Sequence, residues 1–425
     1  MFSKVKNIFK NKSVKDVAWM MSANIIIKPF QIIKSFVVAK YLGPEQYGIL
    51  KSVELIQMLN KFGNLGFVNT VIRDSGEFIG NDDNKGLKDV KNICYSAELI
   101  LIFVLFTIGL LSNFFFNDII IRYAIVLSSI GLFSLKIYNI FSAEAIIHKE
   151  FKLLSKLTIF QGFFNSVIII VTVPFFNLYA VLSVPILSSL ISCYYVYKRL
   201  NFSFSFSFKK KLLYNVLNTS LKLTSGTLAF GLFRYVERIL VITYLGIEAV
   251  GVFGFADTLL AMFVTLFLTV IKVRKMNILE YLGKKEYLKV HNIVVKETLY
   301  LIFSSIVAVA IMQFLLNSLI PIYLEKWVDA IVVSQLFLLV LPLKVLITYF
   351  SVVVMSPTVD KLFYVPVFQL LGVVTLVLGI IFLKYFDKLN ILNFIYLDII
   401  AYIIINVPWV FVYYLEYYKP YIFKK

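Results

Sequence analysis

The sequence is poor in the residues that build disulfide frameworks and metal sites. Its 425 residues include two cysteines, Cys94 and Cys193, and two histidines, His148 and His291. Two cysteines this far apart supply neither a disulfide framework nor the spacing of a metal site. Two histidines exclude a histidine-rich metal site. We therefore expect no metal and no cofactor.

Acidic residues are also scarce, since 24 Asp and Glu stand against 42 Lys and Arg, which gives a formal net charge of +18. Such an excess is compatible with nucleic-acid binding. However, the cations collect where insertion topology would place them, beside anionic lipid headgroups. We therefore expect the partners of these cations to be membrane lipids, and no nucleic acid.

Apolar residues are abundant, at 60% of the chain, and the mean hydropathy is +0.86. Soluble domains are about 45–50% apolar, so the surplus must face something other than water. The 41 Phe and 26 Tyr, against only 10 Pro, suit lipid-facing surfaces and interfacial belts. A bilayer core of about 30 Å takes about 20 residues of helix. The sequence therefore predicts an all-α, multi-pass membrane protein.

Windows of about 20 residues place about twelve transmembrane helices along the chain. The first six are expected at 17–41, 48–72, 93–112, 118–141, 153–173 and 178–197. The second six are expected at 216–245, 250–272, 297–316, 331–355, 363–384 and 392–415.

The loop charges orient these helices. With the N-terminus inside, nearly all loop Lys and Arg fall in cytoplasmic segments, and the other side holds only Lys326, Lys384 and Lys388. By the positive-inside rule, both termini are predicted to be cytoplasmic. No small-residue cleavage site follows the first apolar stretch, so we interpret it as a retained helix and not a signal peptide.

A short motif occurs twice, at an offset of 203 residues. The segment Tyr41–Gly48 (YLGPEQYG) matches Tyr244–Gly251 (YLGIEAVG) at Tyr, Leu, both Gly and Glu. Both copies lie at the turn between the first two helices of a six-helix set. Glycine is needed in such a turn where the backbone takes positive φ or another chain approaches closely.

The repeat divides the chain into two halves. Because each half has an even number of helices, the two bundles are predicted to be related by a parallel pseudo-twofold axis along the membrane normal. We expect an N-terminal bundle at 1–197, a basic cytoplasmic linker at 198–215 and a C-terminal bundle at 216–425. Within the linker, the alternating Phe and Ser of 202–208 indicate either a strand-like stretch or a linker lying on the membrane.

Several charges fall at membrane depth. Four of them lie near predicted helix ends, where the side chain can snorkel to the interface, and we assign them no function: Lys40, Arg122, Lys136 and Lys222. Cations at helix centres cost about 2.5–3.5 kcal/mol on insertion scales, so they should face the bundle interior or water. These are the candidate substrate-binding cations of a central cleft: Lys28, Lys34, Arg234, Arg238 and Lys344.

Helical periodicity groups these cations with other polar residues on single helix faces. Further cleft residues are Asn24, Gln31, Lys51 and Lys61. The stripes of the first and seventh helices, which are equivalent in the repeat, are expected to face each other. Intramembrane carboxylates can carry coupling protons or sodium, and the candidates are Glu54, Glu237 and Asp257. Arg234–Glu237 and Lys51–Glu54 are also spaced as structural (i, i+3) ion pairs, and both interpretations stay open.

The first copy of the motif carries a family resemblance. The string Phe36–Leu50 (FVVAKYLGPEQYGIL) resembles the N-terminal signature of bacterial polysaccharide (O-antigen, Wzx-type) flippases of the multidrug/oligosaccharidyl-lipid/polysaccharide exporter superfamily. Asn64–Arg73 resembles the second helix of that family, and Arg234–Leu240 resembles its second-half equivalent. This chain has Lys40-Tyr41 where the family commonly has Arg followed by Leu, which keeps the charge.

The resemblance implies a flippase of the bacterial inner membrane. Its substrate would be an undecaprenyl-diphosphate-linked oligosaccharide repeat unit, moved from the cytoplasmic to the outer leaflet by alternating access. The resemblance also implies coupling to a proton or sodium gradient, and other glycan-assembly membrane proteins as partners. No bond is made or broken, so we expect no enzyme activity. The sequence contains no GxxxxGK[ST] string, so direct use of ATP is not expected.

Four alternative functions would each require features that differ from those of this sequence. The main alternative is a small-molecule or drug exporter of the same superfamily, which would favour acidic residues in the cleft. A peptidoglycan-precursor flippase would commonly have more than twelve helices. A major-facilitator transporter would show a Gly- and Lys/Arg-rich motif after the second helix, which 73–91 lacks. A membrane glycan polymerase or ligase would usually have a long external loop, and the longest expected here is about 317–330.

Overall fold

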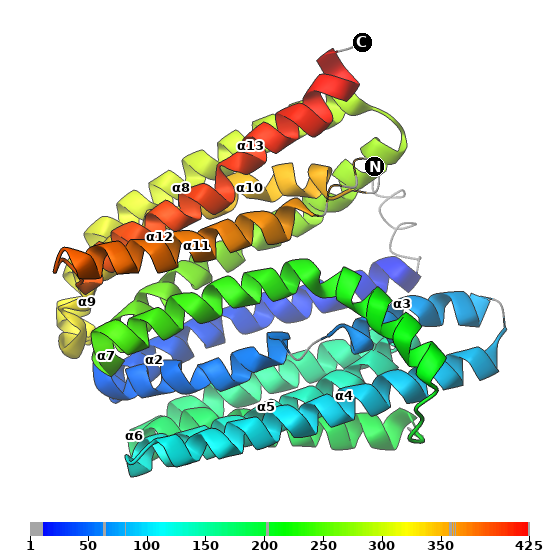
Figure 1. Ribbon diagram of the computed structural model, residues 1–425, viewed down its shortest axis with the longest axis horizontal. Coiled ribbons are helices and arrows are strands. Elements are labelled where there is room, and N and C mark those ends of the chain that lie inside the picture. The colour runs from blue at the N-terminus through cyan, green and yellow to red at the C-terminus, as the bar shows by residue number, and fades with distance from the viewer. Residues whose placement is uncertain are drawn as a thin grey trace. The chain divides into compact units, whose positions relative to one another are not determined.

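The architecture is described from a computed structural model (Figure 1), in which residues 12–62, 65–80, 82–200, 204–356, 359, 361 and 363–423 are described. Within these residues the secondary structure is helical and contains no strand. Eight of the described helices are long and apolar enough to cross a membrane. The predicted all-α, membrane-spanning class is therefore confirmed. The count of twelve, the axis relating the halves and the sidedness of the termini stay predictions.

The helices form two compact units. Unit 1 comprises residues 1–42 and 53–225, and unit 2 comprises 43–52 and 226–425. The break between units thus falls at Ser225, later than the predicted linker. The physical reason lies in the start of the seventh helix, where Val216 packs in one apolar cluster with Phe67 and Tyr95 of unit 1.

Unit 1 is built from long helices. They are α2 (Lys12–Phe62) without residues 43–52, α3 (Phe67–Gly80), α4 (Asn84–Ser112), α5 (Ile119–Ile147), α6 (Phe151–Leu200) and the start of α7 (Lys210–Gly283). Figure 1 shows α4, α5 and α6 running side by side. Asp83 and Asp118 start α4 and α5 by accepting hydrogen bonds from backbone N–H groups of the first turn.

Unit 2 contains the rest of α7 and the C-terminal helices. These are α8 (Tyr287–Tyr323), α9 (Ala330–Leu338), α10 (Val340–Val354), α11 (Tyr364–Tyr385), α12 (Ile391–Asn406) and α13 (Pro408–Tyr413), followed by a π-helical end at Tyr414–Phe423. Helix α12 packs against α9, α10, α11 and α13. One face of α12, which carries Asp398, Tyr402 and Asn406, is therefore buried among other helices, while Tyr396 and Ile400 lie on its exposed face.

Two predicted helices are longer than their apolar windows. The helix expected at 93–112 begins at Asn84, and the one expected at 297–316 runs from Tyr287 to Tyr323. Charged residues such as Lys88 and Lys91 end a hydropathy window, but the backbone hydrogen bonds of a helix continue past the hydrocarbon boundary. The helix expected at 48–72 was also wrong, since α2 ends at Phe62 and α3 begins at Phe67.

The repeated motif supplies one turn in α2 and one in α7, as predicted. The continuous helical runs of α2 and α7 break at Gly43 and Gly246, whose φ angles are +68° and +86°. Only glycine adopts this left-handed conformation without steric strain. The third break, at Asn177 of α6, falls in the predicted gap between 173 and 178 and has φ +46°. The turn positions are thus set by residue type.

Within unit 2, the second glycines of the two motif copies bring the copies into direct contact. A Cβ atom at Gly48 would lie 2.0 Å from the carbonyl oxygen of Ile247, and a Cβ atom at Gly251 would lie 1.9 Å from that of Pro44. The close approach is reciprocal, because each copy places a glycine against the backbone of the other. In each motif copy, the first glycine therefore allows the turn and the second allows the two copies to pack closely.

Gly48→Ala and Gly251→Ala are each expected to destabilise the protein by about 1–3 kcal/mol, because the added methyl group would overlap a backbone carbonyl that cannot rotate away. Thermal unfolding of the protein in detergent measures the effect. Glu248→Ala is the matched control, because Glu248 is an exposed residue of the second motif copy. This variant should melt like the wild type. Unchanged melting of both glycine variants would contradict the packing described.

The segment between α6 and α7, which belongs to unit 1, is fastened to α4. Residues 204–209 belong to no helix and no strand, and residues 202–203 of the alternating run lie outside the described residues. The backbone N–H groups of Ser205 and Ser207 donate to Asn92 Oδ1 (3.2 Å) and Ser96 Oγ (3.0 Å), and Lys209 pairs with Asp89. The linker therefore lies along one face of α4.

Candidate functional site

The predicted membrane-depth charges of unit 2 meet in one place. Arg234, Glu237 and Arg238 lie on the first leg of α7, and Asp257 lies on its second leg. Arg234 and Asp257 lie nearly the same number of residues before and after the turn at Gly246. Because both legs rise equally per residue, the hairpin brings the two side chains to the same depth. The turn glycine thus positions the charges.

Arg234 is the centre of this arrangement. Its Nη1 lies 2.5 Å from Glu237 Oε2 and donates to the Tyr402 hydroxyl at 2.9 Å, while its Nη2 pairs with Asp257. The Tyr402 hydroxyl in turn donates to Glu237 Oε1 at 3.5 Å. The forked guanidinium, with five N–H donors, can serve several acceptors at once, which an ammonium cannot do in this geometry.

Two further cations complete the group. Arg238 Nη2 lies 3.5 Å from Asp257 Oδ2, and its Nη1 donates to the backbone carbonyl of Lys51 at 3.1 Å. Lys344, from α10, lies over the ring of Tyr402 with its Nζ 4.4 Å from the ring centroid. Cations favour the face of an aromatic ring because of its quadrupole. The three cations predicted for this half therefore belong to one group.

Asp398 and Tyr402 of α12 belong to the same site, although the analysis of the sequence did not single them out. The side chain of Asp398 is fully buried, Tyr402 is 3% exposed, and the Asp398 carboxyl group lies beside that of Glu237. We define the unit 2 charge cluster as Arg234, Glu237, Arg238, Asp257, Lys344, Asp398 and Tyr402.

A sequence signal for Asp398 existed. It is the only charged residue between Lys388 and Glu416, and it forms an (i, i+4, i+8) polar stripe with Tyr402 and Asn406. A single carboxylate on an otherwise apolar helix is the pattern that identifies Asp398 from the sequence.

The charges of the cluster balance when every group is ionised: three cations and three carboxylates. Moving an ion into a medium of low dielectric constant costs several kcal/mol unless partners replace its hydration. Glu237 and Arg238 are 1% and 2% exposed, so their neighbours must provide that replacement. Asp257 and Lys344 are half-buried, so the cluster is less enclosed at these two side chains than at Glu237 and Arg238.

Unit 1 contains a buried ion pair between Lys136 and Glu98, and the prediction for Lys136 was wrong. Lys136 was expected to snorkel from a helix end, but its Nζ lies 2.7 Å from Glu98 Oε1 and both side chains are only 1% exposed. Lys136 lies well inside α5, and α4 holds Glu98 opposite it. An acid on the neighbouring helix, which no single-helix pattern reveals, holds the lysine inside.

A carboxylate network continues along the same helices toward their ends. Glu144 accepts from the Tyr95 hydroxyl and from Lys91, each at 2.7 Å. Its side chain is almost fully buried, while that of Lys91 is partly exposed. These contacts join α4 and α5, so we interpret the network as structural.

The predicted cleft residues of unit 1 lie on α2. Lys28, Gln31 and Lys34 are half-buried. The backbone carbonyl of Gln31 accepts a hydrogen bond from Ser35 Oγ (2.9 Å). Glu54 is half-buried in the same unit. Lys51 belongs to unit 2 and lies 5.2 Å from the centroid of the Tyr47 ring. The side chains of Asn24 and Lys61 lie outside the described residues.

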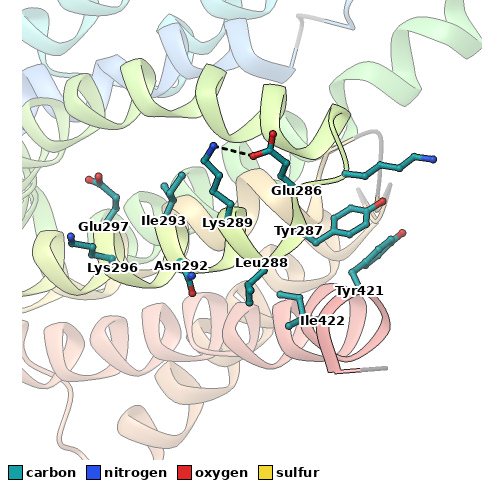
Figure 2. Close-up of a pocket in the computed structure, with 11 residues that line it drawn as sticks. Glu286, Tyr287, Leu288, Lys289, Asn292, Ile293, Lys296, Glu297, Tyr421 and Ile422 are labelled. Carbon is teal, nitrogen blue, oxygen red and sulfur yellow. Dashed lines mark hydrogen bonds and ion pairs between the residues drawn. The ribbon is translucent and has the colours of Figure 1, made fainter. Parts of the chain in front are cut away.

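A separate cavity of about 850 Å³ lies at the start of α8, where the C-terminal helix passes (Figure 2). Lys289 pairs with Glu286 at 3.0 Å there, and Tyr421 and Ile422 line the opposite side. Both members of the ion pair are about half exposed, so the pair contributes little energy. None of the predicted cleft residues lies in this cavity, and it is not the candidate site.

Comparisons with known proteins identify a family and several structures of similar fold. The family described as "Polysaccharide biosynthesis protein" matches residues 13–274. A comparison with curated proteins found no match. Several solved structures share the fold of this chain.

Two of these structures illustrate the likeness. An inward-facing multidrug resistance MATE family transporter of the MOP superfamily has a TM-score of 0.72 at 13% identity, covering 91% of this chain and 93% of its own. A MOP superfamily transporter from Pyrococcus furiosus, in which reverse polarity of the binding pocket suggests a different function, has a TM-score of 0.63 at 12% identity. This likeness covers 94% of this chain and 95% of that transporter. At these identities the likeness shows the fold alone.

Proposed function

Since the chain belongs to the polysaccharide biosynthesis protein family, we propose that it moves a lipid-linked oligosaccharide across the membrane. The substrate we propose is an undecaprenyl-diphosphate-linked repeat unit, passed from the cytoplasmic to the outer leaflet. The observation that carries the proposal is the gathering of Arg234, Arg238 and Lys344 inside an apolar helical unit. Such charges are costly in a membrane and mark a functional site.

The chemistry of the cargo matches these residues. A diphosphate and a hydrophilic glycan must cross about 30 Å of hydrocarbon, where neither can be hydrated. Charge-assisted hydrogen bonds from Arg and Lys replace that hydration, and Arg offers a fork suited to phosphate oxygens. In the proposed mechanism, Lys28 and Lys34 of unit 1 and the cations of the unit 2 charge cluster contact the diphosphate or acidic sugars, and the two units alternate access to them.

The first test of this function is deletion of the gene in its host. Loss of a surface polysaccharide, with its intact lipid-linked precursor trapped in the inner leaflet, is the expected result and would identify the glycan. Unchanged surface glycan, in a strain without a second flippase, would contradict it.

Point variants test the anionic contact. Lys28→Ala and Arg234→Ala should each abolish export while the protein still reaches the membrane, because each removes a cation that replaces hydration of the cargo. Complementation of the deletion strain, scored by surface labelling with membrane content measured in parallel, provides the readout. Lys388→Ala, an exposed cation of unit 2, is the matched control and should restore export fully. Normal export by both variants would contradict the cationic site.

A second candidate function is export of a small molecule or drug. It is favoured by the three carboxylates of the unit 2 charge cluster, which a cationic drug would prefer, and by the fold shared with a multidrug resistance transporter. Sensitivity of the deletion strain to cationic dyes and antibiotics, with an unchanged surface glycan, is the result this alternative predicts.

A further inference from the structure

A small cavity of about 140 Å³ lies in unit 1, where the two ends of α6 meet. The helix turns back on itself at Asn177, and Gln161 Nε2 donates to Ser192 Oγ at 3.0 Å between its two legs. The start of the first leg and the end of the second leg therefore form the walls of the cavity. Pockets for drug-sized molecules measure about 300–1,000 Å³, so this cavity suits a smaller group.

Cations dominate the lining of this cavity. Lys152 and Lys156 come from the start of the first leg, and Arg199 comes from the end of the second leg. Glu150 is the single carboxylate among the described residues that line it, and its Oε2 already lies 3.8 Å from Arg199 Nη2. Three cations against one carboxylate leave an excess of positive charge. The cavity therefore favours a compact anion.

The floor of the cavity belongs to a packed apolar cluster. Leu153 lines the cavity, is buried, and shares this cluster with Val196 of the second leg and Ala145 of α5. The cluster holds together the helix ends that carry the cations, so the cavity is present before any ligand binds. A preformed site lowers the entropic cost of binding.

The exposed surface of the second leg indicates which kind of anion fits. Four exposed side chains, spaced four residues apart, follow one face of this leg: Leu187, Ile191, Tyr195 and Arg199. The face thus changes from apolar, through a tyrosine that lines the cavity, to a cation at the helix end. The hydrocarbon, the interface and the charged headgroups of a membrane leaflet follow one another in the same order. The surface therefore matches a lipid better than a soluble anion.

We propose that this cavity binds the phosphate of an anionic phospholipid, such as phosphatidylglycerol, whose acyl chains lie along the exposed face of the second leg. Lys152, Lys156 and Arg199 donate charge-assisted hydrogen bonds to the phosphate oxygens, the guanidinium through its planar fork. The loop charges predict that this end of α6 is cytoplasmic, and anionic lipids are concentrated in the cytoplasmic leaflet. This binding does not depend on the function proposed above.

Native mass spectrometry of the full chain, released from detergent micelles containing phosphatidylglycerol, tests the site. The double variant Lys156→Ala with Arg199→Ala should bind one phosphatidylglycerol molecule roughly tenfold more weakly than the wild type, because two phosphate contacts are lost. Both side chains are exposed, so this variant should melt like the wild type in detergent alone. Lys85→Ala with Lys88→Ala is the matched control. It removes the same charge from exposed positions at the start of α4, outside the cavity, and should bind like the wild type.

The identity of the lipid is tested by competition. Phosphatidylcholine, which has no net charge, should bind this site far more weakly than phosphatidylglycerol. Inorganic phosphate or undecaprenyl diphosphate, each at a concentration equal to that of phosphatidylglycerol, should not displace it. Displacement by the first would indicate a soluble anion and displacement by the second would indicate the cargo, and either result would overturn the assignment to a phospholipid. Equal binding of phosphatidylcholine, or wild-type binding by the Lys156 and Arg199 double variant, would overturn it as well.

Discussion

Replacing Arg234 with alanine is expected to lower the free energy of unfolding by about 3–5 kcal/mol. The guanidinium pairs with Glu237 and Asp257 and donates to Tyr402, so its loss leaves two carboxylates in an apolar interior without their main partner. Thermal and denaturant unfolding of the purified protein in detergent would measure the change. This loss is much larger than the effect of a typical surface substitution.

The variant Arg234→Lys separates the effect of the positive charge from that of the guanidinium geometry. Arg234→Lys keeps the charge but cannot serve three acceptors through a planar fork, so we expect an intermediate loss of stability. Lys388→Ala, exposed in the same unit, should fall within about 0.5 kcal/mol of the wild type. Wild-type unfolding of Arg234→Ala would show that Arg234 does not hold the cluster together.

Replacing Lys136 with methionine is expected to have a similarly large effect in unit 1. The change keeps most of the side-chain volume but leaves Glu98 as a buried, unpaired carboxylate, which costs about 3–5 kcal/mol. Replacing both members, as Lys136→Met with Glu98→Gln, should restore most of the stability, because no buried charge is then left without a partner. Unfolding of the two single variants and the double variant gives the coupling energy directly.

This cycle also separates structure from transport. If the pair only joins α4 to α5, the double variant should complement the deletion strain. A double variant that is stable but fails to export would mean that Glu98 or Lys136 takes part in transport itself. A Lys136→Met variant as stable as the wild type would contradict the buried pairing. Arg234 differs from this pair, since we propose that the cations of the unit 2 charge cluster contact the cargo directly.

The two charge groups differ in a way that bears on mechanism. Glu98 and Lys136 form a two-membered pair with both side chains 1% exposed, whereas the unit 2 charge cluster has seven members and a partly exposed side at Asp257 and Lys344. A closed pair is suited to fixing the packing of two helices. A cluster with half-buried charged members is better suited to contact an anion.

The sequence by itself determined the class of the protein, because hydropathy and backbone hydrogen bonding in lipid leave few alternatives to membrane-spanning helices. It also determined the turns at Gly43 and Gly246, since φ restriction acts within one residue. The pairing of Arg234 with Glu237 followed from (i, i+3) spacing on one helix. Each of these depends on local geometry, which a sequence contains directly.

Only the tertiary structure decided which charges meet across helices. It placed Asp398 beside Glu237, Lys344 over Tyr402, and Glu98 against Lys136, which had been assigned to the membrane surface. It also placed 43–52 within unit 2, where Gly48 packs against Ile247 and Gly251 packs against Pro44 of the other motif copy. The physical reason is that contacts between helices depend on their rotation and register, and these are set by the packing of the whole core.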